Sequence, residues 1–169
     1  MQSIELPENR NIRYQYFYGC VSLERCIIGN GCDTISKQAF YNCGALKEIS
    51  IPDTVTTIES GAFGGTGISE FVYPPHVTAI SGLGDMPRLT RVEIGENAVS
   101  VTGMGNSPLL KTLIIRTETP PSTDYWTLLN APRIPDIYVP DNAVNAYKTS
   151  NGWRKWAAYI RPMSEIVES

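Results

Sequence analysis

A repeat of 20 to 23 residues is the feature that most constrains the fold of this chain. Phe17, Phe40 and Phe63 follow one another at intervals of 23 residues. The central stretch from Phe40 to Ala62, FYNCGALKEISIPDTVTTIESGA, is copied on both sides with decreasing similarity. A unit of this length cannot enclose a core of its own, so it must bury its apolar side against neighbouring units. The sequence therefore predicts a solenoid.

Within the units, apolar residues recur at three positions that predict a strand, because alternate residues of a strand point to the same face. The five rows are Leu23, Cys26, Ile28; Leu46, Ile49, Ile51; Ile68, Phe71, Tyr73; Leu89, Val92, Ile94; and Leu110, Leu113, Ile115. A proline or glycine follows most rows and marks a turn. We therefore expect one short strand in each unit, with the apolar rows stacked inside the molecule.

A second, shorter apolar pair follows each turn and predicts a brief second strand. The pairs are Cys32/Ile35, Val55/Ile58, Val77/Ile80 and Ala98/Val101. Two strands per unit, and units of nearly constant length, predict a mainly β molecule.

The central unit also resembles a known family. The pattern Phe-x-x-Cys-x-x-Leu-x-x-Ile-x-Ile-Pro-x-x-Val-x-x-Ile-x-x-x-Ala-Phe, found from Phe40 to Phe63, resembles the BspA-like leucine-rich repeats of bacterial surface proteins. The segment Thr119-Pro120-Pro121 is similar to the exit from the last repeat in that family, and residues 137–160 are similar to its closing cap. The resemblance implies a right-handed leucine-rich-repeat solenoid, mainly β with short helical segments, and a C-terminal strand-helix cap.

The expected organisation is a single domain over residues 1–163. It comprises a partial N-terminal turn (1–16), five repeats (17–126) and a C-terminal cap (127–163), and a polar tail (164–169) follows. With 169 residues, 42% of them hydrophobic, the chain can bury one sizeable core. Ile4 and Leu6 resemble the end of a repeat strand, whereas residues 8–16 depart from the pattern and predict a loop or polar cap.

Aromatic residues gather near both ends of the expected solenoid. Tyr14, Tyr16 and Tyr18 are interpreted as a cover over the open N-terminal end, with a sticky surface as the alternative. In the cap, Asp141 or Asn142 is expected to begin a short helix that runs through Lys148. The aromatic and apolar residues of the cap are interpreted as packing, with a sugar-stacking platform as the alternative; they are Ala143, Tyr147, Trp153, Trp156 and Ile160.

Charge and hydropathy argue against two classes of partner. Fourteen basic and 17 acidic residues give a net charge of −3, whereas nucleic-acid binding needs a basic stripe that displaces counterions. No run of 18 apolar residues is present, so the sequence predicts no membrane-spanning segment. The chain also begins without an apolar signal segment. For a secreted or cell-surface protein, this indicates a mature or truncated form.

The four cysteines occupy expected inward positions. Cys20 and Cys43 fall at the same place in successive repeats, and Cys26 and Cys32 replace apolar residues of the central unit. Their spacings lack the paired CxxC arrangement of zinc sites, so we expect buried free thiols and no metal. A disulfide between Cys20 and Cys43 is the alternative, because stacked strands lie about 4.8 Å apart.

No catalytic arrangement of residues is found in the sequence. His76, the single histidine, lies on a turn, and no motif places a serine or cysteine beside it. The Gly-x-Gly pairs lack the full run and the long helix of a nucleotide site. We therefore expect neither enzymatic activity nor a cofactor.

The remaining candidate is the outer face of the predicted strands, on which solenoids bind partners. The candidate binding residues are Arg25, Ile27, Glu48, Ser50, Glu70, Val72, Arg91, Glu93 and Ile114. Arg25 is expected to pair with Glu48, and Glu70 with Arg91. The family resemblance implies an extracellular or cell-surface, non-catalytic binding module for adhesion or protein–protein interaction. The alternative is a structural spacer within a longer surface protein, without a ligand of its own.

Overall fold

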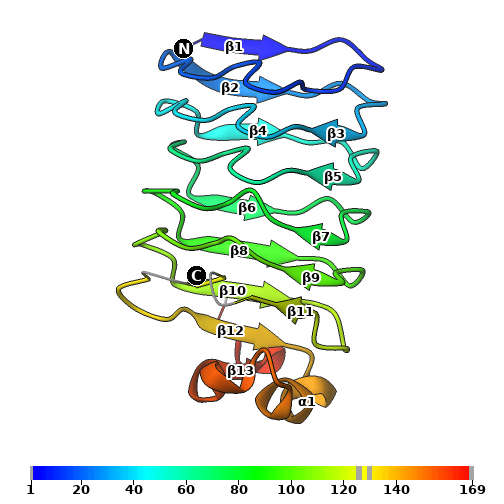
Figure 1. Ribbon diagram of the computed structural model, residues 1–169, viewed down its shortest axis with the longest axis vertical. Helices are drawn as coiled ribbons and strands as arrows, with labels where there is room; N and C mark the ends of the chain where they lie inside the picture. Colours follow the sequence, from blue (N-terminus) through cyan, green and yellow to red (C-terminus); the bar gives the residue numbers. More distant parts are fainter. Residues whose placement is uncertain (1, 125–126, 129–130, 168–169) are drawn as a thin grey trace.

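The chain winds into a stack of parallel turns whose C-terminal end is covered by short helices (Figure 1). The computed structural model describes residues 2–124, 127–128 and 131–167. One side of the stack is formed by strands that we call the first strands. They are β1 (Gln2–Glu5), β2 (Leu23–Ile27), β4 (Glu48–Ser50), β6 (Glu70–Val72), β8 (Arg91–Ile94), β10 (Thr112–Ile115), β12 (Asp136–Val139) and β13 (Ile160–Pro162). The predicted mainly β solenoid is confirmed.

Shorter second strands form another side of the stack, as the sequence predicts. They are β3 (Thr34–Ile35), β5 (Thr57–Ile58), β7 (Ala79–Ile80), β9 (Ser100–Val101) and β11 (Ser122–Thr123). Strand pairs are parallel and follow the repeat register, so that Cys26 lies opposite Ile49 and Leu113 opposite Val92. Equivalent residues of successive turns therefore stack directly on one another.

The core consists of the stacked apolar columns. Leu46, Val92 and Leu113 are fully buried, as are most of their equivalents. At the edge away from the first strands, the ring of Phe40 lies between those of Phe17 and Phe63, with centroid distances of 5.1 and 5.5 Å. The rings are nearly parallel, at interplanar angles of 13° and 8°. This stack links three successive turns.

The N-terminal turn is more regular than the sequence analysis predicts. Ile12 is buried and bridges to Ile35, so residues 8–16 follow the repeat after all. The interpretation of the tyrosines as a cover for the core is wrong, since Tyr14, Tyr16 and Tyr18 are 60%, 55% and 46% exposed. Because Ile12 and Phe17 take the inward positions, the tyrosines between and after them point outward.

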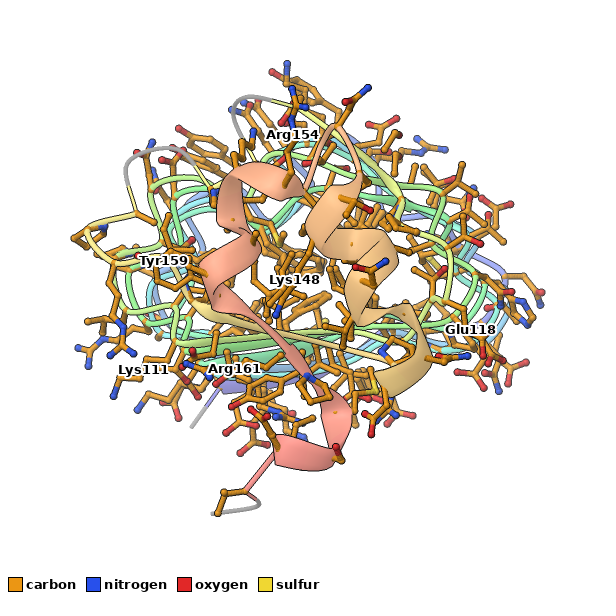
Figure 2. All side chains as sticks on the ribbon, turned by 90° about the horizontal axis from the view of Figure 1, so that it is seen from below. Lys111, Glu118, Lys148, Arg154, Tyr159 and Arg161 are labelled. Atoms are coloured by element: carbon orange, nitrogen blue, oxygen red, sulfur yellow. The ribbon has the colours of Figure 1, made fainter. Side chains whose placement is uncertain are left out.

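The C-terminal cap closes the other end of the core. It contains the helices η1 (Asp141–Ala143), α1 (Val144–Thr149), η2 (Arg154–Tyr159) and η3 (Met163–Glu165). Figure 2, seen from this end, shows α1 and η2 lying across the stack. Trp153 is fully buried and donates its indole N–H to the Pro121 carbonyl at 2.7 Å, while the Tyr147 hydroxyl donates to the Thr117 carbonyl at 3.0 Å. These aromatic residues pack, as predicted.

Two details of the cap differ from the prediction. Neither Asp141 nor Asn142 caps a helix, because η1 begins after Pro140 without a side-chain cap. Instead, the Asp141 carboxylate accepts a hydrogen bond from the backbone N–H of Ser164 at 3.1 Å. The contact with Ser164 lowers the pKa of Asp141 and ties η3 to the cap. The boundary expected at Trp126 and the last two tail residues lie outside the described residues.

The stack of first strands is interrupted between the second and third repeats. One sheet has the order β1-β2-β4 and the next begins at β6, and the second strands break at the same place, between β5 and β7. Figure 1 shows the wider interval between β4 and β6. At the phenylalanine edge the same turns stay connected, since the N–H groups of Phe40 and Asn42 donate to the carbonyls of Ala62 and Gly64 at 2.8 Å. Beside the second strands, the Ser81 hydroxyl still donates to the Ile58 carbonyl at 2.7 Å, so the turns spread apart mainly on the side of the first strands.

Two large side chains mark this interruption. Phe71 on β6 and Tyr73 directly after it are both inward and aromatic, whereas isoleucine occupies the equivalent positions on and directly after β4. The Phe71 ring lies 5.0 Å from the rings of Phe63 and Tyr73, and the Tyr73 hydroxyl donates to the Ser81 carbonyl. Burial raises the pKa of Tyr73, so the hydroxyl stays neutral. We attribute the separation to the volume of these rings between the two turns.

Candidate binding surface on the strand face

The strand face, defined as the outward side of the first strands, brings together most of the candidate residues. Five of them are exposed: Arg25, Glu48, Ser50, Glu70 and Val72. Three others, Ile27, Arg91 and Glu93, are half-buried. The alternation of inward and outward residues along each strand places them there, because the apolar columns fix which side is buried.

Ile114 is a correction to this set. The sequence predicts an exposed apolar side chain, but Ile114 is only 1% exposed. Its neighbours in register are Glu93 on β8 and Tyr138 on β12, both with long side chains that flank it. Ile114 is therefore buried on the strand face and offers no surface to a partner.

Charged side chains on the strand face are held in pairs along and across the strands. Arg25 and Glu48 lie 3.5 Å apart, as predicted. The predicted pair of Glu70 and Arg91 is not found, although the two are opposite in register. Arg91 binds Glu93 at 3.1 Å instead, and Arg116, which the sequence analysis missed, binds the other oxygen of Glu93 at 2.7 Å. Glu93 on β8 lies close enough to both arginines to hold them.

The interruption of the sheet forms a groove on the strand face, which we call the interstrand groove. It has a volume of about 430 Å³ and is lined by residues of β4 and β6 and of the turns that follow them. Ile49 and Ile51 are only half-buried here, whereas their equivalents on neighbouring strands, such as Cys26 and Val92, are fully buried. The repeat pattern does not predict this groove, and the signal for it in the sequence is the pair of aromatic residues Phe71 and Tyr73.

The four cysteines are free thiols. Cys26, Cys32 and Cys43 are fully buried, whereas Cys20 is half-buried, so the prediction of four fully inward side chains holds for three. Burial raises the pKa of Cys26 to about 12 and that of Cys43 to about 11. Within the described ranges, no three His, Cys, Asp or Glu side chains come together as metal ligands.

His76 is exposed on the turn after β6. In the part of the chain that the structure describes, no helix has both the length and the apolar character needed to cross a bilayer.

Comparisons with known proteins agree with this architecture. The stacked turns and the outward strand face define a leucine-rich-repeat solenoid. Residues 1–83 match the family described as BspA type leucine rich repeat region, in six copies, which confirms the family resemblance that the sequence pattern predicts. No curated protein sequence matches the chain.

Two solved structures are similar to the chain. The pneumococcal vaccine antigen PcpA is 21% identical, with a TM-score of 0.70 over 100% of this chain and 42% of that one. A leucine-rich repeat protein from Bacteroides ovatus is 20% identical, with a TM-score of 0.49 over 85% of this chain and 49% of that one. The likeness to PcpA shows the fold. The chain spans less than half the length of either structure.

Proposed function

We propose that the chain is a non-catalytic binding module of a secreted or cell-surface bacterial protein, and that its strand face binds a protein partner. The BspA-type repeats support the repeat-module part of this proposal, and the likeness to PcpA, a vaccine antigen, favours a surface location. The observation that carries the binding role is Val72, which is 64% exposed in the middle of the strand face. An exposed apolar side chain bordered by charges is typical of a binding surface.

A structural spacer is the second candidate, because the strand face also has a feature that would suit a solvated surface. Its charges largely satisfy one another, in the Arg25–Glu48 pair and in the Glu93 cluster with Arg91 and Arg116. The exposed Arg25–Glu48 pair contributes at most about 1 kcal/mol to stability, and charges that are already paired in this way need no partner.

A matched pair of substitutions separates the two candidates. Val72 lies on the strand face and Val99 beside the second strands, and they are 64% and 67% exposed. The immobilised chain and its Val72→Lys, Ile27→Lys and Val99→Lys variants would be tested against purified host extracellular proteins and bacterial surface proteins. If the chain is a binding module, Val72→Lys or Ile27→Lys lowers its affinity for one partner by at least about tenfold, which corresponds to about 1.4 kcal/mol. Val99→Lys leaves the affinity for that partner unchanged.

The spacer candidate predicts a different result. No protein of the panel binds the chain, or Val99→Lys weakens binding as much as Val72→Lys does. Either outcome would refute the strand face as the binding surface.

A further inference from the structure

The interstrand groove is bordered on one side by an open edge of β4. In a parallel sheet, alternate residues direct their backbone N–H and C=O groups to opposite sides of the strand. The N–H of Ile28 donates to the carbonyl of Ser50 at 2.9 Å, so the backbone N–H and C=O groups of Ser50 are directed toward β2. The backbone groups of Ile49 and Ile51 are therefore directed into the groove, where no ladder receives them.

The opposite side of the groove is an open edge of β6. The N–H of Tyr73 donates to the carbonyl of Glu93 at 3.0 Å, so the backbone N–H and C=O groups of Tyr73 are directed toward β8. The backbone groups of Glu70 and Val72 consequently point into the groove from the other side. Two strand edges thus face each other across the groove, each with donors and acceptors at the spacing of a parallel ladder.

An extended polypeptide is the class of ligand that matches both edges at once, because its own N–H and C=O groups alternate between its two sides. We propose that an extended segment of a partner protein inserts between β4 and β6 and joins the two sheets into one. This inference rests on the proposed function and names the site and the form of the ligand. The inserted strand would hydrogen-bond to Ile49 and Ile51 on one side and to Glu70 and Val72 on the other.

The side chains around the groove define the sequence that such a segment needs. Its inward side chains would meet Ile49 and Ile51, which are half-buried and apolar, so apolar residues are favoured there. Its outward side chains would face the rim. The charged residues that line the groove, Asp53 and Glu70, are both acidic and exposed. A segment in which apolar and basic residues alternate therefore fits the groove.

The test uses a synthetic probe, an acetylated and amidated peptide of alternating valine and lysine residues. Amide hydrogen exchange of the full chain is measured by NMR with and without the probe. In the free chain, the amides that face the groove exchange faster than those of Ile28 and Tyr73, which are in ladders. When the probe is bound, exchange slows by at least about tenfold at the four groove-facing amides. These amides belong to Ile49, Ile51, Glu70 and Val72.

Control peptides test the chemistry of recognition. A probe N-methylated at alternate residues loses its donors along one side, and it should leave exchange unchanged. A probe with glutamate in place of lysine should bind at least about tenfold more weakly at low salt, because it meets the acidic rim. Equal binding of the methylated probe would overturn the inference, and so would protection spread evenly over the chain.

A variant pair on β6 provides an independent measurement. Val72→Pro removes a groove-facing N–H and leaves the β6–β8 ladder intact, because Val72 is directed away from β8. Val72→Thr keeps both the N–H and the side-chain shape. The proline variant should bind the probe at least about tenfold more weakly than the threonine variant. If the proline variant does not fold, the exchange pattern of the unmodified chain decides the question.

Failure of this inference can be told from failure of the proposed function. A surface partner that is lost on Val72→Lys, but that neither competes with the probe nor slows exchange at the groove, would leave the binding module standing and refute strand insertion. Protection by the probe, without any partner in the protein panel, would support the groove and refute the proposed function.

Discussion

Truncation of Phe40 tests the stacking of turns most directly. Phe40 is fully buried, and its ring lies between those of Phe17 and Phe63 at centroid distances of 5.1 and 5.5 Å. Phe40→Ala would remove the ring from the middle of this stack. The loss affects two interfaces between turns, so it should weaken the solenoid more than the same change at its end.

The magnitude follows from burial and stacking. A fully buried phenylalanine changed to alanine typically costs about 3 to 5 kcal/mol, including the cavity that it leaves. Each stacked aromatic neighbour adds about 0.5 to 1.5 kcal/mol beyond area burial. With two such neighbours, Phe40→Ala should cost about 5 kcal/mol. Phe17 is 9% exposed and has one stacked phenylalanine, so Phe17→Ala should cost about 3 kcal/mol.

Urea denaturation, followed by circular dichroism, gives the free energy of unfolding of the parent and both variants. Phe40→Leu is a useful control, because it keeps most of the volume and loses the ring stack. It should fall between the parent and Phe40→Ala. Equal, small losses for Phe40→Ala and Phe17→Ala would refute the reasoning, since they would mean that the rings do not hold the turns together.

Two further predictions concern the thiols and the cap. Because alkylation needs the thiolate and burial raises the pKa values of Cys26 and Cys43 to about 12 and 11, iodoacetamide at pH 8 should label half-buried Cys20 first. Mass spectrometry should find the other cysteines unlabelled until the chain is denatured, and early labelling of Cys26 would contradict its inward position. Trp153→Ala should lower stability by about 3 to 5 kcal/mol, and Trp156→Ala, whose side chain is 7% exposed, by less. Melting temperatures equal to that of the parent would mean that the cap does not depend on these rings.

The repeat pattern predicts the architecture well, because each apolar position recurs in several units of the sequence. Three positions per unit identify the first strands, and the column of Phe17, Phe40 and Phe63 is found as a stack. The prediction is weaker where a segment matches the repeat at only one apolar position, as residues 8–16 do. Ile12 lies 23 residues before Ile35, but the polar residues around it conceal the register.

The candidate surface could be predicted only in part. The alternation along each strand places Val72 and Glu48 outward, but it contains no information about what lies beside them. Ile114 is buried because of its neighbours on adjacent strands. Arg91 binds Glu93 rather than Glu70, although register places Glu70 opposite Arg91. The groove depends on the volume of the packed Phe71 and Tyr73 rings. A pattern that only separates apolar from polar residues contains no information about side-chain volume.

The interruption between β4 and β6 also affects how the chain unfolds. In a linear array, stability is approximately a sum of the stability of each turn and the coupling between nearest neighbours. At this junction the coupling lacks both ladders and relies on the phenylalanine edge and on the hydrogen bond that the Ser81 hydroxyl donates to the Ile58 carbonyl. The coupling between neighbouring turns is therefore weakest at this junction, and unfolding that begins at the N-terminal turns is expected to stop there. We therefore expect the chain to unfold as two cooperative segments that separate between β4 and β6.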